Sequence, residues 1–257
     1  MLLNGWLRRK TPGMVIDCHC HLEAGELPQR VLEDADRLGI DKLVVCSLGD
    51  YDYEPRHEKC VQANRQVVRL MKAHPDRIIG FCYVNPAFAE SADEIETCVR
   101  QFGMKGLKLW VSVLATDERV FPVVEKAGRL GIPVLMHAWK KATGNLPFES
   151  TPEQAAWLAR RYPDIVFIMA HIGGEWERGI KAARPVPNLL VDTSGSIIEC
   201  GMIEAAVEQL GAERVVFGSD VPGVELAVPF AKVSGADITD AEKRLVMGGN
   251  MQRILGV

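Results

Sequence analysis

The stretch "VIDCHCHL", residues 15–22, is a short apolar run that ends in side chains able to bind a transition metal. Its near-continuous hydrophobicity predicts a β-strand covered on both faces, as in a parallel sheet. Because side chains alternate between the faces of a strand, His19 and His21 are predicted to share one face. Cys18 and Cys20 are then predicted to point into a layer of helices and to behave as small buried apolar residues.

Runs of the same kind recur along the chain, with longer amphipathic segments between them. The other seven runs cover residues 41–48, 77–85, 103–110, 132–138, 164–171, 188–194 and 213–220. Eight strands alternating with helices in about 250 residues predict a single-domain α/β fold, a (β/α)8 TIM barrel. We expect the barrel to span residues 14–257, after a loosely attached N-terminal extension over residues 1–13. An open, doubly wound sheet is the alternative, although no glycine-rich phosphate loop follows the first strand.

The composition is that of an ordinary globular protein, with 47% hydrophobic and 25% charged residues among 257. A net charge of -4 argues against a nucleic-acid partner and against a basic membrane-binding patch. The seven cysteines form no C-x-x-C pair, and the N-terminus has no apolar core of signal-peptide length. We therefore expect a cytoplasmic protein with a small-molecule substrate, no membrane association and potential for homo-oligomer formation.

Polar side chains collect at the ends of the predicted strands, where barrel enzymes have their active sites. Four of the six histidines fall there, and His57 and His74 are the two exceptions. The full set of strand-end candidates is His19, His21, Lys108, His137, His171, Asp192 and Asp220.

A histidine pair on the first strand, single histidines on the fifth and sixth, and an aspartate after "FGS" on the eighth form a specific combination. With it come the motifs "PDRIIGFCYVNP", "GLKLW", "VLMHA", "IMAHIGG", "VVFGSDVP" and "MGGNMQRILG". From about Met14 to its end, the sequence resembles the amidohydrolase superfamily of metal-dependent barrel hydrolases. More narrowly it resembles the amidohydrolase-2 family, which includes lactone hydrolases and non-oxidative decarboxylases of the aminocarboxymuconate-semialdehyde type.

The resemblance implies one divalent metal ion bound by His19, His21 and His137, with Asp220 beside it as a ligand or base. Imidazoles with one carboxylate suit Zn²⁺, and Mn²⁺ is the alternative. Asp220 and His171 are the implied catalytic residues: Asp220 moves a proton, and His171 hydrogen-bonds water or polarises the substrate carbonyl.

The side chains of Lys108, Trp110 and Trp139, at or after the fourth and fifth strands, are the candidates for substrate binding. Lys108 is predicted to bind a substrate carboxylate as a compact cation, or alternatively to pair with a buried acid. Asp17 is expected to orient a neighbour. Asp192 is expected either to bond nearby backbone N–H groups or to contact substrate.

Two chemistries are compatible with such a site. The first expectation is a hydrolase in which a metal-bound hydroxide attacks a small ester, lactone or amide, with a carboxylated substrate favoured. The alternative is non-oxidative, metal-dependent decarboxylation of an unsaturated or aromatic acid. A second alternative is a non-catalytic metal-binding barrel. The compact chain with its short loops favours the hydrolase.

Overall fold

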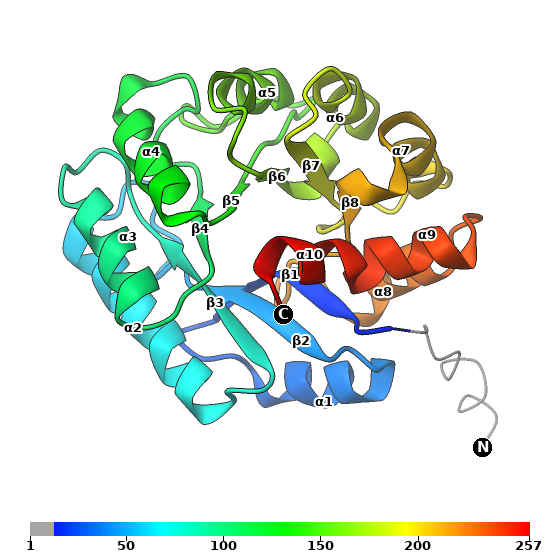
Figure 1. The fold of residues 1–257 in the computed structure, drawn as a ribbon, viewed down its shortest axis with the longest axis horizontal. Coiled ribbons are helices and arrows are strands. Elements are labelled where there is room, and N and C mark those ends of the chain that lie inside the picture. Colours follow the sequence, from blue (N-terminus) through cyan, green and yellow to red (C-terminus); the bar gives the residue numbers. More distant parts are fainter. Residues whose placement is uncertain (1–12) are drawn as a thin grey trace.

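The barrel is formed by eight parallel strands that lie side by side in chain order (Figure 1). The structure is a computed structural model that describes residues 13–257. Its strands are β1 (Ile16–His21), β2 (Lys42–Cys46), β3 (Ile78–Tyr83), β4 (Gly106–Leu109), β5 (Val134–Met136), β6 (Phe167–Met169), β7 (Leu189–Asp192) and β8 (Val215–Val216). Backbone hydrogen bonds from Cys18 N to Phe217 O (2.9 Å) and from His21 N to Val221 O (2.7 Å) join β1 to the chain after β8. These bonds confirm the predicted single-domain (β/α)8 barrel over the open sheet.

Helices surround the strands in the described part of the chain (Figure 1). They are α1 (Gln29–Leu38), α2 (His57–Ala73), α3 (Ser91–Arg100), α4 (Phe121–Leu130), α5 (Pro152–Arg161), α6 (Trp176–Ala183), α7 (Met202–Leu210), α8 (Ala227–Ser234), α9 (Asp240–Arg244) and α10 (Asn250–Leu255). Helix α5 begins as its sequence indicates, because Thr151 and Gln154 form a capping box around Pro152. The predicted N-terminal extension lies outside the described residues, except for Gly13.

The apolar side chains form an inner and an outer layer, as expected for strands covered on both faces. The inner layer fills the barrel with residues such as Ile16, Val44 and Val216. Met251 and Leu255 of α10 join it, so α10, which crosses the middle of the ring in Figure 1, seals the N-terminal end of the barrel. The outer layer packs the strands against the helices. The other end of the barrel is thereby left for the polar side chains at the strand ends.

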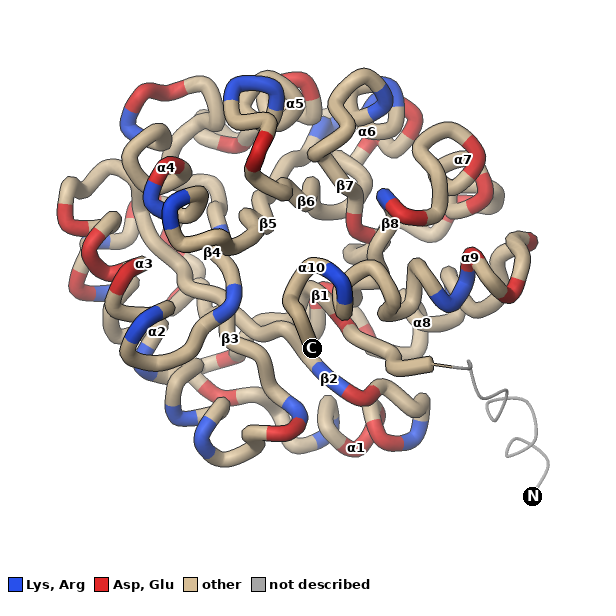
Figure 2. Tube along the Cα trace, in the orientation of Figure 1, with Lys and Arg blue, Asp and Glu red and all other residues tan. Residues whose placement is uncertain are grey.

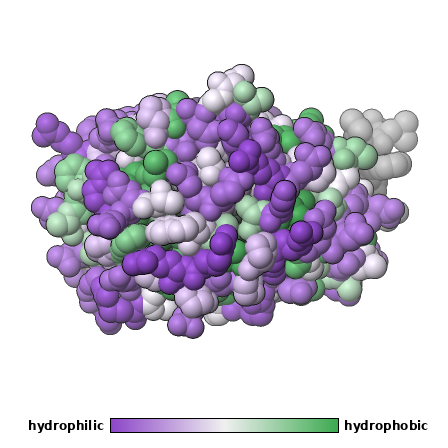
Figure 3. Space-filling view, turned by 90° about the horizontal axis from the view of Figure 1, so that it is seen from above, coloured by the Kyte–Doolittle hydropathy of each residue, from purple (hydrophilic) through white to green (hydrophobic). Residues whose placement is uncertain are grey.

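The charged residues lie mostly on the surrounding helices and loops (Figure 2). On the face drawn in Figure 3, hydrophilic residues predominate and apolar residues are scattered. Among the described residues, no helix is long and apolar enough to cross a membrane.

The prediction that both cysteines of β1 point outward is half wrong. Cys20 packs in the outer layer as predicted, but Cys18 packs inside the barrel. The cause is a bulge in β1: between Asp17 and Cys20 the strand carries one more residue than its partner β2. The extra residue shifts the alternation, so Cys18 joins the inner layer and Asp17 does not share the face of His19 and His21. Asp17 instead accepts hydrogen bonds from the N–H groups of His19 and Ser219.

The strands are shorter at their C-terminal ends than the apolar runs predict. His137, His171 and Asp220 follow the last residues of β5, β6 and β8 by one, two and four positions. They therefore sit beyond the strands at the open end of the barrel, and His171 and Asp220 have positive φ values that a strand would not allow.

Asn250 at the start of α10 has a structural role. Its buried Nδ2 donates to the carbonyl oxygens of Ala212 (2.7 Å) and Val215 (2.8 Å), which ties α10 to the start of β8. We expect Asn250→Ala to lower the free energy of unfolding by about 2 kcal/mol, because two buried carbonyls lose their partner. Urea denaturation measures this. Gln252→Ala on the same helix should stay within about 0.5 kcal/mol of the parent, and an equal loss in both variants would contradict the assignment.

Candidate metal centre

His19 and His21 meet Asp220 at the open end of the barrel. The two Nε2 atoms are 3.1 Å apart, and Asp220 Oδ1 lies 3.2 Å from His21 Nε2 and 3.7 Å from His19 Nε2. His19 is sealed from solvent, whereas about a quarter (26%) of the Asp220 side chain remains exposed. The structure thus brings together three of the four predicted metal ligands, with the carboxylate on the solvent side.

Asp192 fixes the ring of His19 from behind. Asp192 is fully buried, and its Oδ2 accepts a hydrogen bond from His19 Nδ1 at 2.9 Å. A carboxylate can only accept, so the proton of His19 is on Nδ1 and the lone pair on Nε2 faces Asp220. Burial opposes ionisation of Asp192, but His19 and Ser194 outweigh it and hold the pKa of this carboxyl well below its usual range. Asp192 Oδ1 also accepts from the backbone N–H groups of His171 and Ser194, as one of the two alternatives from the sequence predicts.

His171 joins the same network through Ser194. The Ser194 hydroxyl donates to Asp192 Oδ1, and its oxygen lies 2.9 Å from His171 Nδ1, which must then be the donor. Nε2 of His171 is thereby left unprotonated. One ligand atom each from His19, His171 and Asp220 lies within 4.8 Å of the others, as a metal ion requires. His171 is therefore as close to the centre as the residues predicted to bind the ion.

The backbone is strained at both residues predicted to be catalytic. His171 has φ 60° and Asp220 has φ 71°, in the left-handed region that non-glycine residues rarely adopt. Such strain costs on the order of 1–3 kcal/mol and is concentrated at functional sites. The geometry of these two side chains is thus held at the expense of local stability.

The fourth predicted ligand, His137, lies to one side of this group. Its ring centroid is 5.1 Å from that of His171, and its Nε2 is 3.0 Å from Glu149 Oε1. Glu149 comes from the loop between β5 and α5 and is buried. Lys141 donates to both of its carboxylate oxygens at 2.8 Å.

Lys108 of β4 points into the barrel, directly beneath the histidines. It is 1% exposed, and its Nζ donates to His19 Nε2 at 2.7 Å. Among the described residues, no carboxylate oxygen lies within 4.0 Å of Nζ. The predicted alternative, a buried ion pair for Lys108, is therefore wrong.

Aromatic rings border the site on two sides. Trp139 lies 4.7 Å from the ring of His171, between centroids, and thus borders the site. Trp110 does not reach the histidines directly. It packs at 5.9 Å against Tyr51, which in turn lies 6.4 Å from His21.

The donor set fits a divalent metal ion. Burial lowers the pKa of His19 to about 4 and that of His171 to about 3, so both rings are neutral near pH 7. Burial also lowers the pKa of His21, but the Cys46 sulfur and Asp220 outweigh burial and raise it to about 9, so a cation would displace a proton there. Two imidazole nitrogens about 2.1 Å from one ion lie about 3 Å apart, which matches the separation of His19 and His21. Convergent lone pairs and a carboxylate suit a shared cation.

Three residues near the site escape prediction from the sequence: Cys46, Glu149 and Ser194. Cys46 Sγ lies 3.2 Å from His21 Nδ1. Its position at the end of β2 is a signal that strand-end analysis could have used. Ser194 belongs to the "DTSG" segment, residues 192–195, and nothing in that segment indicates that it reaches two histidines. Glu149 has no local signal, because it lies on an irregular loop twelve residues after His137.

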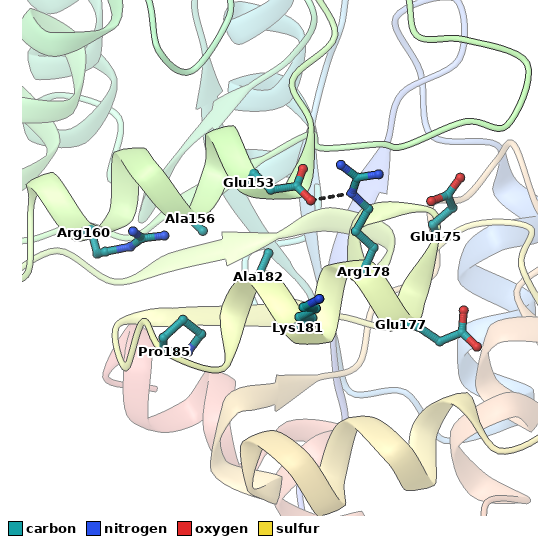
Figure 4. A pocket seen from close by; sticks show the side chains of 9 residues that line it. All are labelled: Glu153, Ala156, Arg160, Glu175, Glu177, Arg178, Lys181, Ala182 and Pro185. Carbon is teal, nitrogen blue, oxygen red and sulfur yellow. Dashed lines mark hydrogen bonds and ion pairs between the residues drawn. The ribbon is translucent and has the colours of Figure 1, made fainter.

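The surface also has cavities that lie apart from this centre. A groove of about 620 Å³ runs between α5 and α6, lined in part by Arg160, Arg178 and Lys181 (Figure 4). Its lining includes none of the predicted site residues. A smaller cavity of about 340 Å³ lies beside the loops after β5 and β6, with Trp139 and Glu175 in its lining. Trp139 also packs against His171, so this second cavity adjoins the loops around the metal centre.

A family model described as amidohydrolase matches residues 16–257. The chain belongs to the amidohydrolase family. This confirms the resemblance to the amidohydrolase-2 family, and the protein is thus an enzyme of that family.

Relatives of this amidohydrolase include several decarboxylases. The chain is 22% identical over 235 residues to 2-amino-3-carboxymuconate-6-semialdehyde decarboxylase from Dictyostelium discoideum, with 76% of this chain and 65% of that relative covered. The fold is similar to that of 2,6-dihydroxybenzoate decarboxylase from Rhizobium (TM-score 0.77, 14% identity, 95% of this chain and 99% of that chain). It is also similar to a dihydroxybenzoic acid decarboxylase from a Polaromonas species with bound manganese (TM-score 0.76, 17% identity, 95% and 97% covered). At these identities the solved structures show the fold alone.

We expect His19→Ala to lose the bound metal, because His19 Nε2 lies at the centre of the convergent donors. Elemental mass spectrometry on protein loaded with Mn²⁺ and then desalted measures the metal content per chain. His74→Ala, at the C-terminal end of α2 and so at the other end of the barrel, should keep the parent's content. Undiminished metal in His19→Ala would show that the ion binds elsewhere.

Proposed function

We propose that this amidohydrolase removes a carboxyl group, without oxidation, from a small unsaturated or aromatic acid in a metal-dependent reaction. This is the alternative rather than the first expectation from the sequence. The observation that carries it is the buried Lys108, whose Nζ has no carboxylate within 4.0 Å among the described residues. Since a lysine side chain is a compact cation with three donor protons, a buried one without an acidic partner favours an anionic substrate group.

The substrate carboxylate would thus be drawn to the floor of the site. Lys108 is 1% exposed, and its Nζ lies 2.7 Å from His19 Nε2, so a metal ion on that nitrogen would take its lone pair and free the ammonium for a substrate carboxylate. In surroundings sealed from water, a charge-assisted hydrogen bond is stronger than at the surface. The carboxylate is then held next to the proposed metal ligands, while the remainder of a small acid extends toward Tyr51 and Trp139.

Four residues would hold the metal ion: His19, His21, His137 and Asp220. When bound, a divalent ion supplies Lewis acidity that stabilises negative charge developing on the substrate. His19 is held for this task by Asp192 through Nδ1. The metal of this protein is proposed as Mn²⁺ or Zn²⁺, since imidazole and carboxylate donors accept both.

Loss of carbon dioxide requires a proton at the carbon that bore the carboxyl group. A C–H bond forms, the bond to the carboxyl carbon breaks, and its electron pair returns to the conjugated system, so no oxidant is needed. Asp220 is placed to carry this proton, because its carboxylate is partly exposed on the substrate side of the histidines. His171 can hydrogen-bond the substrate through Nε2, which the Ser194 contact leaves free.

The comparisons support decarboxylation over hydrolysis. Most of the named similar enzymes are decarboxylases, and one is a 4-oxalomesaconate hydratase from Rhodopseudomonas palustris. Decarboxylation and hydrolysis draw on the same ligands, so the distinction depends on how the acid group of the substrate is held.

A paired substrate panel tests the proposal. Protein loaded with Mn²⁺ is incubated with aromatic and conjugated carboxylic acids, and with esters and lactones of the same skeletons. We expect carbon dioxide release from at least one acid, measured as bicarbonate, and none after removal of the metal by chelation. Cleavage of esters or lactones with no carbon dioxide from any acid would establish the hydrolase instead.

Lys108→Met should weaken the binding of the acid substrate. We expect KM to rise about tenfold or more, since a hydrogen bond to a charged group contributes about 1.5–3 kcal/mol. Metal content is measured in parallel, because Lys108 also contacts His19. Lys105→Met, an exposed lysine just before β4, is the control and should leave KM unchanged. A parental KM in Lys108→Met would remove Lys108 from substrate binding.

A further inference from the structure

We propose that Glu149 is a positioning residue: it holds the proton of His137 on Nε2 and thereby presents the Nδ1 lone pair as the metal-binding atom. His19 and His171 have the opposite arrangement, with the proton on Nδ1. The two kinds of histidine would thus approach the ion with different nitrogens. The catalytic relevance of this assignment rests on the proposed metal-dependent function, whereas the position of the proton does not.

The first observation is the environment of the Glu149 carboxylate. It is 3% exposed and accepts four hydrogen bonds: one from His137, two from Lys141 and one from the backbone N–H of Leu146 at 3.1 Å. Oε2 accepts from both Lys141 and the Leu146 N–H, and Oε1 accepts from the Lys141 ammonium, which has no lone pair of its own. The carboxylate therefore acts as an acceptor toward His137 as well.

The second observation concerns the ring of His137. With Glu149 as an obligate acceptor at 3.0 Å, Nε2 must carry the proton, and a neutral imidazole then has its lone pair on Nδ1. Among the described residues, Nδ1 has no hydrogen-bond partner. It is the one ring nitrogen of His137 that a ligand can reach without displacing a protein contact.

The third observation is that the loop is built around this contact. Between β5 and α5 the chain turns back, and the backbone N–H of Glu149 donates to Leu146 O. Trp139 N donates to Ser150 O at 2.8 Å, and the Asn145 side chain donates to the carbonyl of Trp139. These bonds place Glu149 against His137 even though it lies twelve residues further along the chain. A ligand histidine held through its second nitrogen by a carboxylate is a recurrent arrangement in metal sites.

Nuclear magnetic resonance of the metal-free protein tests the proton position directly. With ¹⁵N-labelled histidine, and with His137 assigned by its loss in His137→Gln, we expect a single neutral form protonated on Nε2. Its proton should be shifted downfield by the carboxylate and should exchange slowly with water. In Glu149→Gln this proton should move upfield and exchange faster. A proton on Nδ1 in the parent protein would overturn the proposal, even if no variant folded.

Metal affinity supplies the second readout. We expect Glu149→Gln to bind Mn²⁺ about tenfold more weakly or worse, as measured by electron paramagnetic resonance titration, since loss of a carboxylate behind a ligand histidine typically costs 10–100-fold. Glu153→Gln is the matched control, because Glu153 is a half-exposed carboxylate on α5 that pairs with Arg178. Equal affinities in parent and Glu149→Gln would contradict the proposal.

These outcomes are separable from those of the proposed function. Neither readout uses a substrate, so absence of decarboxylation leaves the role of Glu149 standing. Conversely, the parent protein could release carbon dioxide while the Glu149→Gln variant keeps both the Mn²⁺ affinity and the His137 proton position. That result would support the proposed function and contradict the positioning role of Glu149.

Discussion

The carboxylate of Asp192, sealed inside the end of β7, accepts hydrogen bonds from the ring of His19, from the backbone N–H of His171 and from Ser194. In a barrel lined with apolar side chains, an unpaired carboxylate would cost several kcal/mol, so these partners are obligatory. Through them one buried charge ties β1, β6 and β7 together and sets the proton position on the ring of His19. The orientation of the whole donor group depends on this contact.

The same principle applies to the rest of the site: a buried carboxylate that can only accept hydrogen bonds determines which ring nitrogen of a neighbouring histidine carries the proton. Asp192 and Glu149 are both buried acceptors, and each fixes the proton of one histidine at the nitrogen that faces it. Lys108 differs because no carboxylate of the described residues forms an ion pair with its Nζ. A site in which the buried carboxylates have hydrogen-bond partners and one cation has no acidic partner favours the binding of an anion. The strained backbone at His171 and Asp220 shows that the geometry of the site is maintained at a cost in stability.

The sequence is sufficient for the barrel and for most of the site, since apolar runs and strand-end histidines are local patterns. The prediction that Cys18 points outward was wrong because β1 contains a bulge. At this bulge the strand lies close to Gly218, which is distant in the sequence: a Cβ there would lie 3.0 Å from His19 Cβ and 3.2 Å from Cys18 Sγ. Glu149 was missed because an irregular loop brings it back to His137, and no short-range pattern encodes that return. The ligand motifs are common to hydrolysis and decarboxylation and do not distinguish them. Hydrolysis was the first expectation because the chain is compact and its loops are short. The discriminating feature, the lack of an acid beside Lys108, is visible only in three dimensions.

Anomalous X-ray diffraction from crystals of the Mn²⁺-loaded protein tests the central claim most directly, because it locates the ion among the donors. The account predicts one manganese peak per chain, contacted by Nε2 of His19, Nε2 of His21, Nδ1 of His137 and the Asp220 carboxylate, with Lys108 close by but not bound to the ion. Two manganese peaks, or a single peak away from His19 and Asp220, would contradict it.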